Sequence, residues 1–153
     1  MKEDQYFRKE LIWLDMDYPD KEALFVDAGR KLHSLNYVRS DLGEALGRRE
    51  ADYPTGLLTE PFPVAIPHTD PEYVNSPCIA FLRLKKPILF EHMGEPEKTV
   101  PAQFIFVLGV KDPAAQVKVL SAVIRMISDH VFMQRLKGLN DQEEISVMLN
   151  NSI

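Results

Sequence analysis

The feature that most constrains the fold is residues 104–110, FIFVLGV, an apolar run in which polar and apolar residues do not alternate. A strand with one face in water alternates, so an unbroken run predicts a strand that is buried on both faces. Three more short runs, PVAI, CIAFLRL and PILF, are apolar and are bounded by proline, glycine or charged residues, as strands are. A sheet buried in this way needs helices to cover it.

Helical patterns lie on both sides of these runs, with apolar residues recurring at spacings of three and four. Asp112 followed by Pro113 is the clearest helix start, since an N-cap residue precedes proline at the first helical position. The order of two helices, four strands and three helices predicts a single α/β domain, residues 1–153, in which helices pack against a sheet. The helices are expected at about 20–35 with Asp20 as cap, from Ser40 as cap to before Pro54, from Asp112 through Ile127, and at about 131–136 and 141–149.

Composition excludes several classes of protein. The 23 acidic and 18 basic residues give a net charge of −5 without a run of like charge, which argues against a nucleic-acid binder. A single cysteine, Cys78, excludes an internal disulfide and is expected to pack as a small hydrophobe. No apolar stretch is long enough to span a membrane and the N-terminal residues are charged, so we expect a cytoplasmic protein that does not insert into membranes.

Common catalytic and metal-binding motifs are absent. The chain has no G-x-x-x-x-G-K, G-x-G-x-x-G, G-x-S-x-G or H-E-x-x-H, which removes the usual support for nucleotide binding and serine hydrolysis. The histidines are far apart in sequence and there is one thiol, so no metal site is predicted. His33, His92 and His130 are interpreted as solvated or locally bonded, and His92 is kept as a second candidate because its loop could fold near a site.

His68 differs from the other histidines because of the residues before it. Pro67 fixes its own backbone torsion and favours extended geometry at Ile66, so a strand is predicted to run up to His68 and end there. An imidazole at a strand end can act as a nucleophile, and a phosphorylated ring nitrogen stays reactive enough to pass the group on. The alternative is a structural histidine that bonds a turn, and His68 taken alone favours that alternative.

A second candidate element, RREADYPTG, precedes this strand. Arg48 and Arg49 at a helix end offer forked donors that suit phosphate oxygens, and the amides of Thr55 and Gly56 in a tight loop could approach an anion. The alternative is an ordinary helix end, where cations complement the dipole, followed by a proline-glycine turn.

Together these elements form a pattern, RREADYPTGLLTEPFPVAIPH, that resembles the active-site region of the enzyme IIA components of the bacterial sugar phosphotransferase system. The resemblance is to the fructose/mannitol superfamily (type 2), and the order of helices and strands matches it over nearly the whole chain. The stretches READYPTGLL, AIPH and DPAAQVKVL are most similar to the galactitol-specific branch. This resemblance implies a three-layer α/β/α fold with a small mixed sheet, and a phosphotransferase that needs no metal or other cofactor.

The resemblance also implies roles for individual residues. His68 would accept a phosphoryl group on Nε2 from the phosphocarrier protein HPr and pass it to a cysteine of an enzyme IIB component, which phosphorylates a sugar entering through the membrane enzyme IIC. Arg49, the amides of Thr55 and Gly56, and Gln116 would neutralise the phosphoryl oxygens. Gln116 stands where mannitol-type members have a second histidine, and glutamine can donate a hydrogen bond but cannot become cationic.

Two other functions fit the same residues. The first is a regulatory enzyme IIA-like protein, in which phosphorylation of His68 controls a binding partner and moves no sugar. The second is a non-catalytic binding module that keeps the fold, with Gln116 as a sign that activity has been lost.

Overall fold

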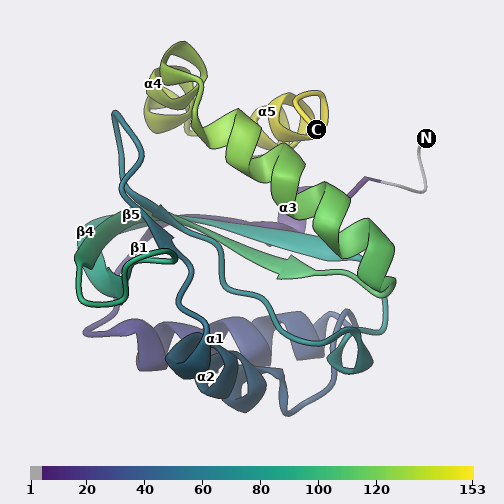
Figure 1. Cartoon of the computed structure of the whole chain (residues 1–153). Coiled ribbons are helices and arrows are strands. Elements are labelled where there is room, and N and C mark those ends of the chain that lie inside the picture. The colour runs from purple at the N-terminus through teal and green to yellow at the C-terminus, as the bar shows by residue number, and fades with distance from the viewer. Residues whose placement is uncertain (1–4) are drawn as a thin grey trace.

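The computed structural model describes residues 5–153, and at the centre of this part of the chain is a five-stranded mixed sheet (Figure 1). Its order is β1-β4-β5-β3-β2, with β4 antiparallel to β5 and parallel to β1, and β3 parallel to β5 and antiparallel to β2. The predicted domain bounds, 1–153, include residues 1–4, which lie outside the described part. The strands are β1 (Ile12–Met16), β2 (Gly56–Leu57), β3 (Val64–Ala65), β4 (Cys78–Glu91) and β5 (Thr99–Gly109).

Helices cover both faces of the sheet, as Figure 1 shows. The helices α1 (Lys21–Ser34) and α2 (Leu42–Asp52) lie on one face. On the other face lie α3 (Pro113–Ile127), α4 (His130–Gly138) and α5 (Gln142–Asn150). The predicted three-layer α/β/α fold is therefore confirmed. Short 3-10 turns, η2 (Lys9–Leu11) and η3 (Pro71–Tyr73), precede β1 and β4.

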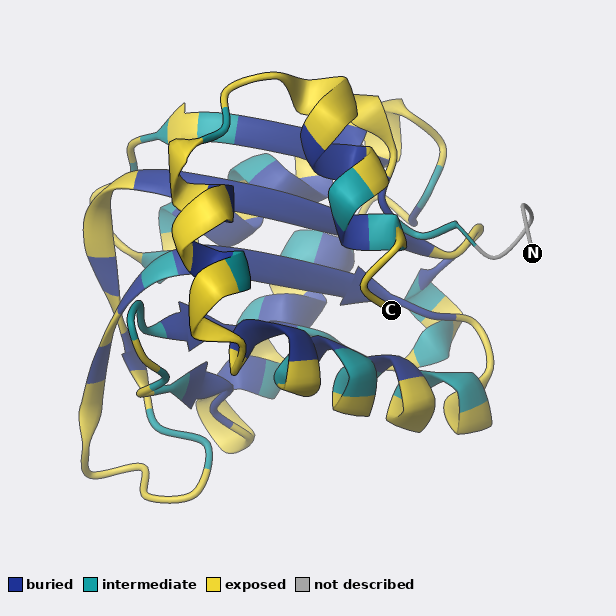
Figure 2. Cartoon of the chain, turned by 90° about the horizontal axis from the view of Figure 1, so that it is seen from above, coloured by how far each residue is buried: buried dark blue, intermediate teal, exposed yellow. Residues whose placement is uncertain are grey.

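Strand β5 contributes to both hydrophobic cores, as its unbroken apolar run predicts. Ile105 and Val107 pack into the core shared with α1 and α2. Phe104, Phe106 and Leu108 alternate with them and pack into the core shared with α3, α4 and α5. The central strands are buried along most of their length in Figure 2, so the sheet is a rigid support for whatever follows its strand ends.

The strands differ from the prediction in three places. The runs CIAFLRL and PILF are one strand, β4, whose pairing with β5 shifts register between Arg83 and Ile88. Pro87 lies in that irregular section, because proline cannot donate to the ladder but can be accommodated where pairing is disrupted. Strand β1 was not predicted, since it is short, carries an aspartate and buries only its first two residues fully. Strand β2 lies where we expected part of a tight loop.

Aspartates cap most of the helices. Within residues 5–153, four of the five α-helices are preceded by an aspartate whose side chain accepts a hydrogen bond from the backbone amide three residues later, as the sequence predicted for Asp20 and Asp112. The cap predicted at Ser40 is wrong, because a turn closed by the Leu42 amide on the Arg39 carbonyl (3.2 Å) places Asp41 at the N-cap. In the four helices with an aspartate cap, the side chain and the amide that donates to it are Asp20–Ala23 (2.9 Å), Asp112–Ala115 (3.3 Å), Asp129–Phe132 (3.1 Å) and Asp141–Glu144 (3.0 Å).

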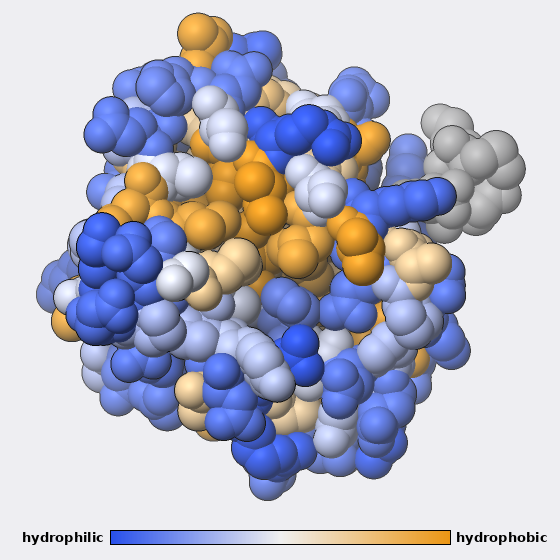
Figure 3. Space-filling model, viewed as in Figure 1, coloured by the Kyte–Doolittle hydropathy of each residue, from blue (hydrophilic) through white to orange (hydrophobic). Residues whose placement is uncertain are grey.

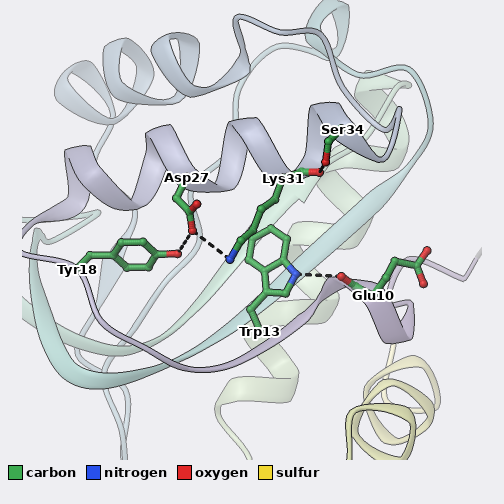
Figure 4. Close-up of polar contacts among 6 residues, drawn as sticks. All are labelled: Glu10, Trp13, Tyr18, Asp27, Lys31 and Ser34. Atoms are coloured by element: carbon green, nitrogen blue, oxygen red, sulfur yellow. Dashed lines mark hydrogen bonds and ion pairs between the residues drawn. The ribbon is translucent and has the colours of Figure 1, made fainter.

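Polar contacts attach α1 to the β1 edge of the sheet (Figure 4). Asp27 accepts a hydrogen bond from the Tyr18 hydroxyl and pairs with Lys31 at 3.1 Å. The Lys31 ammonium lies 4.9 Å from the centre of the Trp13 ring. The ring nitrogen of Trp13 donates to the carbonyl of Glu10 (2.9 Å). These contacts hold α1 in place, and α1 in turn supports α2.

The two helices of that layer meet at a pair of glycines. A Cβ atom added to Gly29 would lie 2.8 Å from the amide nitrogen of Gly43. The two helices can therefore approach so closely only because both positions lack a side chain. This contact sets the position of α2, the helix that carries Arg49.

Candidate functional site

His68 lies just beyond β3, where the chain still runs beside β5. The Leu108 amide donates to the Pro67 carbonyl (3.0 Å), and His68 forms an isolated parallel bridge with Leu108. The Nδ1 atom of His68 is 2.8 Å from the Ile66 carbonyl oxygen. A carbonyl only accepts, so Nδ1 carries the proton and Nε2 keeps a free lone pair. The half-buried ring therefore presents an unprotonated Nε2 from a rigid strand end.

The environment of His68 keeps its imidazole neutral. Burial lowers the pKa of His68 below its ordinary value, and the positive charge of Arg49 lowers it further, while the hydrogen bond to Ile66 acts in the opposite direction. A neutral ring at pH 7 is the form that can act as a nucleophile. Arg49 lies near His68 although the two are 19 positions apart in sequence, since its guanidinium pairs with Asp70, two residues after His68.

Arg49, on the last turns of α2, is held in place without using most of its donors. Its guanidinium carbon lies 4.3 Å from the centre of the Tyr53 ring, and Nη1 is 3.8 Å from Asp70 Oδ1. The Nε atom is buried and has no hydrogen-bond partner within residues 5–153. With 37% of its side chain exposed, Arg49 can still donate to an anion beside His68. Arg48, in contrast, points to the Tyr73 hydroxyl (3.2 Å).

Thr55 and Gly56 do not form the tight loop with amides free for an anion that we expected. Thr55 is 2% exposed, and its amide and hydroxyl both donate to the Glu50 carboxylate, at 2.7 and 2.9 Å. Gly56 begins β2, where an added Cβ would lie 2.7 Å from the Glu91 carbonyl oxygen. The glycine is therefore needed for close packing of backbones. A direct contact of the Thr55 amide with phosphate would require Thr55 to leave Glu50.

Gln116 reaches the site from the first turns of α3. Its Nε2 donates to the carbonyl of Thr69, the residue after His68, at 3.3 Å. The structure therefore brings together three of the predicted residues, Arg49, His68 and Gln116, from α2, the end of β3 and α3. The side-chain amide of Gln116 is half-buried and is engaged with the loop that follows the histidine.

Three contributors to the site were missed at the level of sequence: Glu50, Tyr53 and Asp70. Glu50 follows Leu42 and Leu46 at intervals of four, a spacing that places it on the buried stripe of α2, so its burial could have been predicted. Tyr53 follows Arg49 by four residues at the end of the same helix, a spacing that could have indicated their contact. Asp70 contacts Arg49 only because the chain folds back, and no local spacing indicates it.

Two of the other histidines, His92 and His33, and the cysteine have local roles. In the turn between β4 and β5, Nδ1 of His92 accepts from the amides of Gly94 and Glu95, at 3.0 and 3.2 Å. His33 bonds the Val38 carbonyl through Nδ1 (3.1 Å). Cys78 is buried, and burial raises the pKa of its thiol to about 12, as suits a residue that packs as a hydrophobe.

No metal centre and no membrane span accompany the site. Within residues 5–153, no three histidine, cysteine or acidic side chains are grouped so that they could hold a metal ion. None of the helices in the same residues is both long and apolar enough to cross a bilayer.

A three-layer α/β domain that presents a neutral histidine beside an arginine has the site of a histidine phosphoryl carrier. The family described as "Phosphoenolpyruvate-dependent sugar phosphotransferase system, EIIA 2" matches residues 5–152. The chain belongs to this family. It is a type 2 enzyme IIA component of the phosphotransferase system.

Relatives in the family differ in overall organisation. The galactitol-specific EIIA component of Escherichia coli (strain K12) is 27% identical over 84% of this chain and 85% of its own length. Multiphosphoryl transfer protein 1 of the same organism is 29% identical over 94% of this chain, which spans only 17% of that protein's length.

Solved structures show the same fold. The nitrogen regulatory protein IIA of Neisseria meningitidis matches with a TM-score of 0.73 at 28% identity, over 94% of this chain and 95% of that one. The mannitol enzyme IIA of Escherichia coli, solved in complex with phosphorylated mannitol enzyme IIB, matches with a TM-score of 0.71 at 19% identity, over 92% and 94%.

Proposed function

We propose that this protein carries a phosphoryl group on Nε2 of His68, between a phosphorylated donor and an enzyme IIB acceptor. The observation that carries the proposal is the 2.8 Å hydrogen bond between His68 Nδ1 and the Ile66 carbonyl, which leaves Nε2 free as nucleophile. His68 and its Nε2 atom are also the acceptor that the resemblance to the family implies.

Transfer would proceed by in-line displacement. The Nε2 lone pair attacks phosphorus as the bond from phosphorus to the donor breaks, and the electron pair of that bond stays on the donor. The negative charge on the phosphoryl oxygens is neutralised by Arg49, whose side chain is 37% exposed. Gln116 would contribute one neutral hydrogen bond if its amide turns from Thr69 to the phosphate. Thr55 and Gly56 support the backbone around the site.

The surface beside the site suits transient protein partners. Tyr53, which contacts Arg49, is 61% exposed. Val117, the residue after Gln116, is 67% exposed. Apolar side chains also gather between α3 and the sheet on the face shown in Figure 3. An apolar core with a charged rim is the usual composition of such interfaces. We propose HPr as donor, enzyme IIB as acceptor, membrane enzyme IIC as indirect partner, and the cytoplasm as location.

Galactitol, or a related polyol or sugar, is the substrate class that we propose for the transport system. The support is the 27% identity to the galactitol-specific component, which covers most of both chains. A second candidate function is regulation by phosphorylation of His68, which is supported by 28% identity over nearly the full length of the nitrogen regulatory protein.

The test is phosphorylation by purified components. Incubation with phosphoenolpyruvate, enzyme I and HPr should place an acid-labile phosphate on the wild-type protein and none on His68→Ala. His92→Ala is the matched control and should be labelled as wild type. An unlabelled wild-type protein would leave only the binding-module function, and label on His68→Ala would show that the site is elsewhere. Transfer of the label to a galactitol enzyme IIB separates the transport role from the regulatory one.

A further inference from the structure

Glu50 is a buried carboxylate beside the site that has no direct part in phosphoryl transfer. It is 2% exposed and continues the buried stripe of α2. Its two oxygens are bound by Thr55, whose amide donates to Oε2 at 2.7 Å and whose hydroxyl lies 2.9 and 3.1 Å from the two oxygens. A carboxylate in such a place costs solvation energy that an apolar side chain would not. Packing of α2 alone does not explain it.

A chain of hydrogen bonds leads from Glu50 to the nucleophile. Thr55, held by Glu50, accepts a bond from the Ile66 amide on its carbonyl oxygen, at 3.3 Å. Ile66 in turn accepts the Nδ1 proton of His68 on its own carbonyl oxygen, at 2.8 Å. The orientation and tautomer of the imidazole therefore depend on a backbone position that Thr55 sets.

The same carboxylate closes the end of α2. The bond that the Thr55 amide donates to Glu50 spans the turn 50–55, in which the Tyr53 amide donates to the Arg49 carbonyl (2.7 Å). The Tyr53 ring, carried by that turn, lies 4.3 Å from the Arg49 guanidinium carbon. Loss of the bond between Glu50 and Thr55 would free the turn that supports Arg49.

We propose that Glu50 is a positioning residue that couples the two halves of the site, because through Thr55 it orients both the His68 imidazole and the Arg49 guanidinium. The proposal rests on the proposed function of His68, since it assigns Glu50 a role in that transfer. An ionised Glu50 strengthens both bonds from Thr55, and these bonds offset part of the cost of burying the charge.

The charged form of Glu50 is lost just below neutral pH. Burial raises the pKa of Glu50 to about 7, and the nearby charge of Glu91 on β4 raises it further. The bonds from Thr55 and the charge of Lys21 on α1 act in the opposite direction. The bonds from Thr55 are therefore at full strength only above that pH. Transfer should slow as the pH falls through about 7, before His68 itself protonates, because burial lowers the pKa of His68 below its ordinary value.

The kinetic test is the rate of phosphoryl transfer from phospho-HPr as a function of pH. Glu50→Gln should slow transfer by about tenfold at pH 8 and should lose the inflection near neutral pH, since misplacement of reacting groups by a fraction of an ångström has effects of this size. Glu44→Gln, an exposed acid on the same helix, should behave as wild type. Thr55→Ser keeps both donors and should retain the rate, whereas Thr55→Val loses the hydroxyl and should be slower. A wild-type inflection retained in Glu50→Gln would overturn the proposal.

The second test needs no phosphoryl transfer. Nitrogen NMR of the imidazole should show one tautomer of His68, protonated at Nδ1, in the wild type and a mixture in Glu50→Gln. An unchanged tautomer in the variant contradicts the coupling even if the wild type is never phosphorylated, so the failure of the proposed function and the failure of this inference are distinguishable.

Stability separates positioning from a purely structural role. Because the pKa of Glu50 is raised on folding, its ionisation makes the folded state less stable as the pH rises from the ordinary carboxyl range toward 7. Glu50→Gln should therefore melt no lower than wild type at pH 8 although it transfers more slowly. A clearly lower melting temperature at that pH would show that Glu50 serves the fold and not the site.

Discussion

Two arginines of this protein, Arg83 and Arg49, have nearly opposite surroundings. The side chain of Arg83, on β4, is 7% exposed, and that of Arg49, on α2, is 37% exposed. Arg83 uses donors all round its guanidinium, whereas Arg49 has one long ion pair, an aromatic ring beneath it and a buried Nε with no partner among the described residues.

The partners of Arg83 all belong to the fold. Its guanidinium donates to the carbonyls of Lys137 and Leu139 at the end of α4 and to Asn140 Oδ1 (2.7 Å), and Nε lies 3.4 Å from Asp15. A cation that caps helix carbonyls in this way attaches α4 to the sheet. Satisfied donors thus mark a structural arginine, and donors held in place but unused mark one that can receive a ligand.

The largest effect on stability is expected from Arg83→Met. Each hydrogen bond from a charged group contributes roughly 1.5–3 kcal/mol, so loss of several should lower the free energy of unfolding by about 3 kcal/mol. Urea unfolding followed by circular dichroism measures this. Arg125→Met, which removes an exposed arginine from α3, is the control and should change stability by less than about 0.5 kcal/mol. Equal midpoints for the two variants would refute the structural role of Arg83.

Arg49→Ala should show the reverse behaviour. Removal of one preorganised donor from a developing charge typically slows the chemical step about 100-fold, or about 2.7 kcal/mol. The unfolding midpoint should hardly change, because Arg49 has few partners to lose. Single-turnover transfer from phospho-HPr measures the rate. Arg48→Ala is the matched neighbour and should transfer as wild type; a similar loss in both variants would mean that general positive charge, not Arg49, matters.

The smallest effect is expected from Gln116. Gln116→Ala removes a neutral hydrogen-bond donor, which contributes about 0.5–1.5 kcal/mol, so transfer should slow by roughly two- to tenfold. Gln116→His restores a group that can become cationic and should give a rate that rises at lower pH relative to wild type. A wild-type rate in Gln116→Ala would place this residue outside the site and leave it with its contact to Thr69 alone.

Much of the architecture could be predicted from local patterns. The unbroken run of β5 predicted a strand buried on both faces, and Asp20 and Asp112 predicted the starts of two helices, because caps and periodicity act within a few residues. Strand β1 could not be found in this way, since an edge strand buries only part of its surface. The division of β4 into two predicted strands came from Pro87, which interrupts the pairing without ending the strand.

For the candidate site, the sequence by itself determined the short strand before His68, the arginines at the end of α2 and the glutamine on α3, because each depends on residues close in sequence. The strand is shorter than predicted, since β3 ends at Ala65 and His68 forms only an isolated bridge. Only the tertiary structure decided how these groups are used. The Thr55 amide proved to be bound to Glu50, Arg49 proved to rest on Tyr53 near Asp70, and a backbone carbonyl proved to orient His68. The partners in these contacts are two to five residues apart, except for Asp70, and so each contact alone is local. What local sequence does not specify is how α2, β3 and α3 pack against each other, and that packing brings the helix end, the strand end and Gln116 to one place.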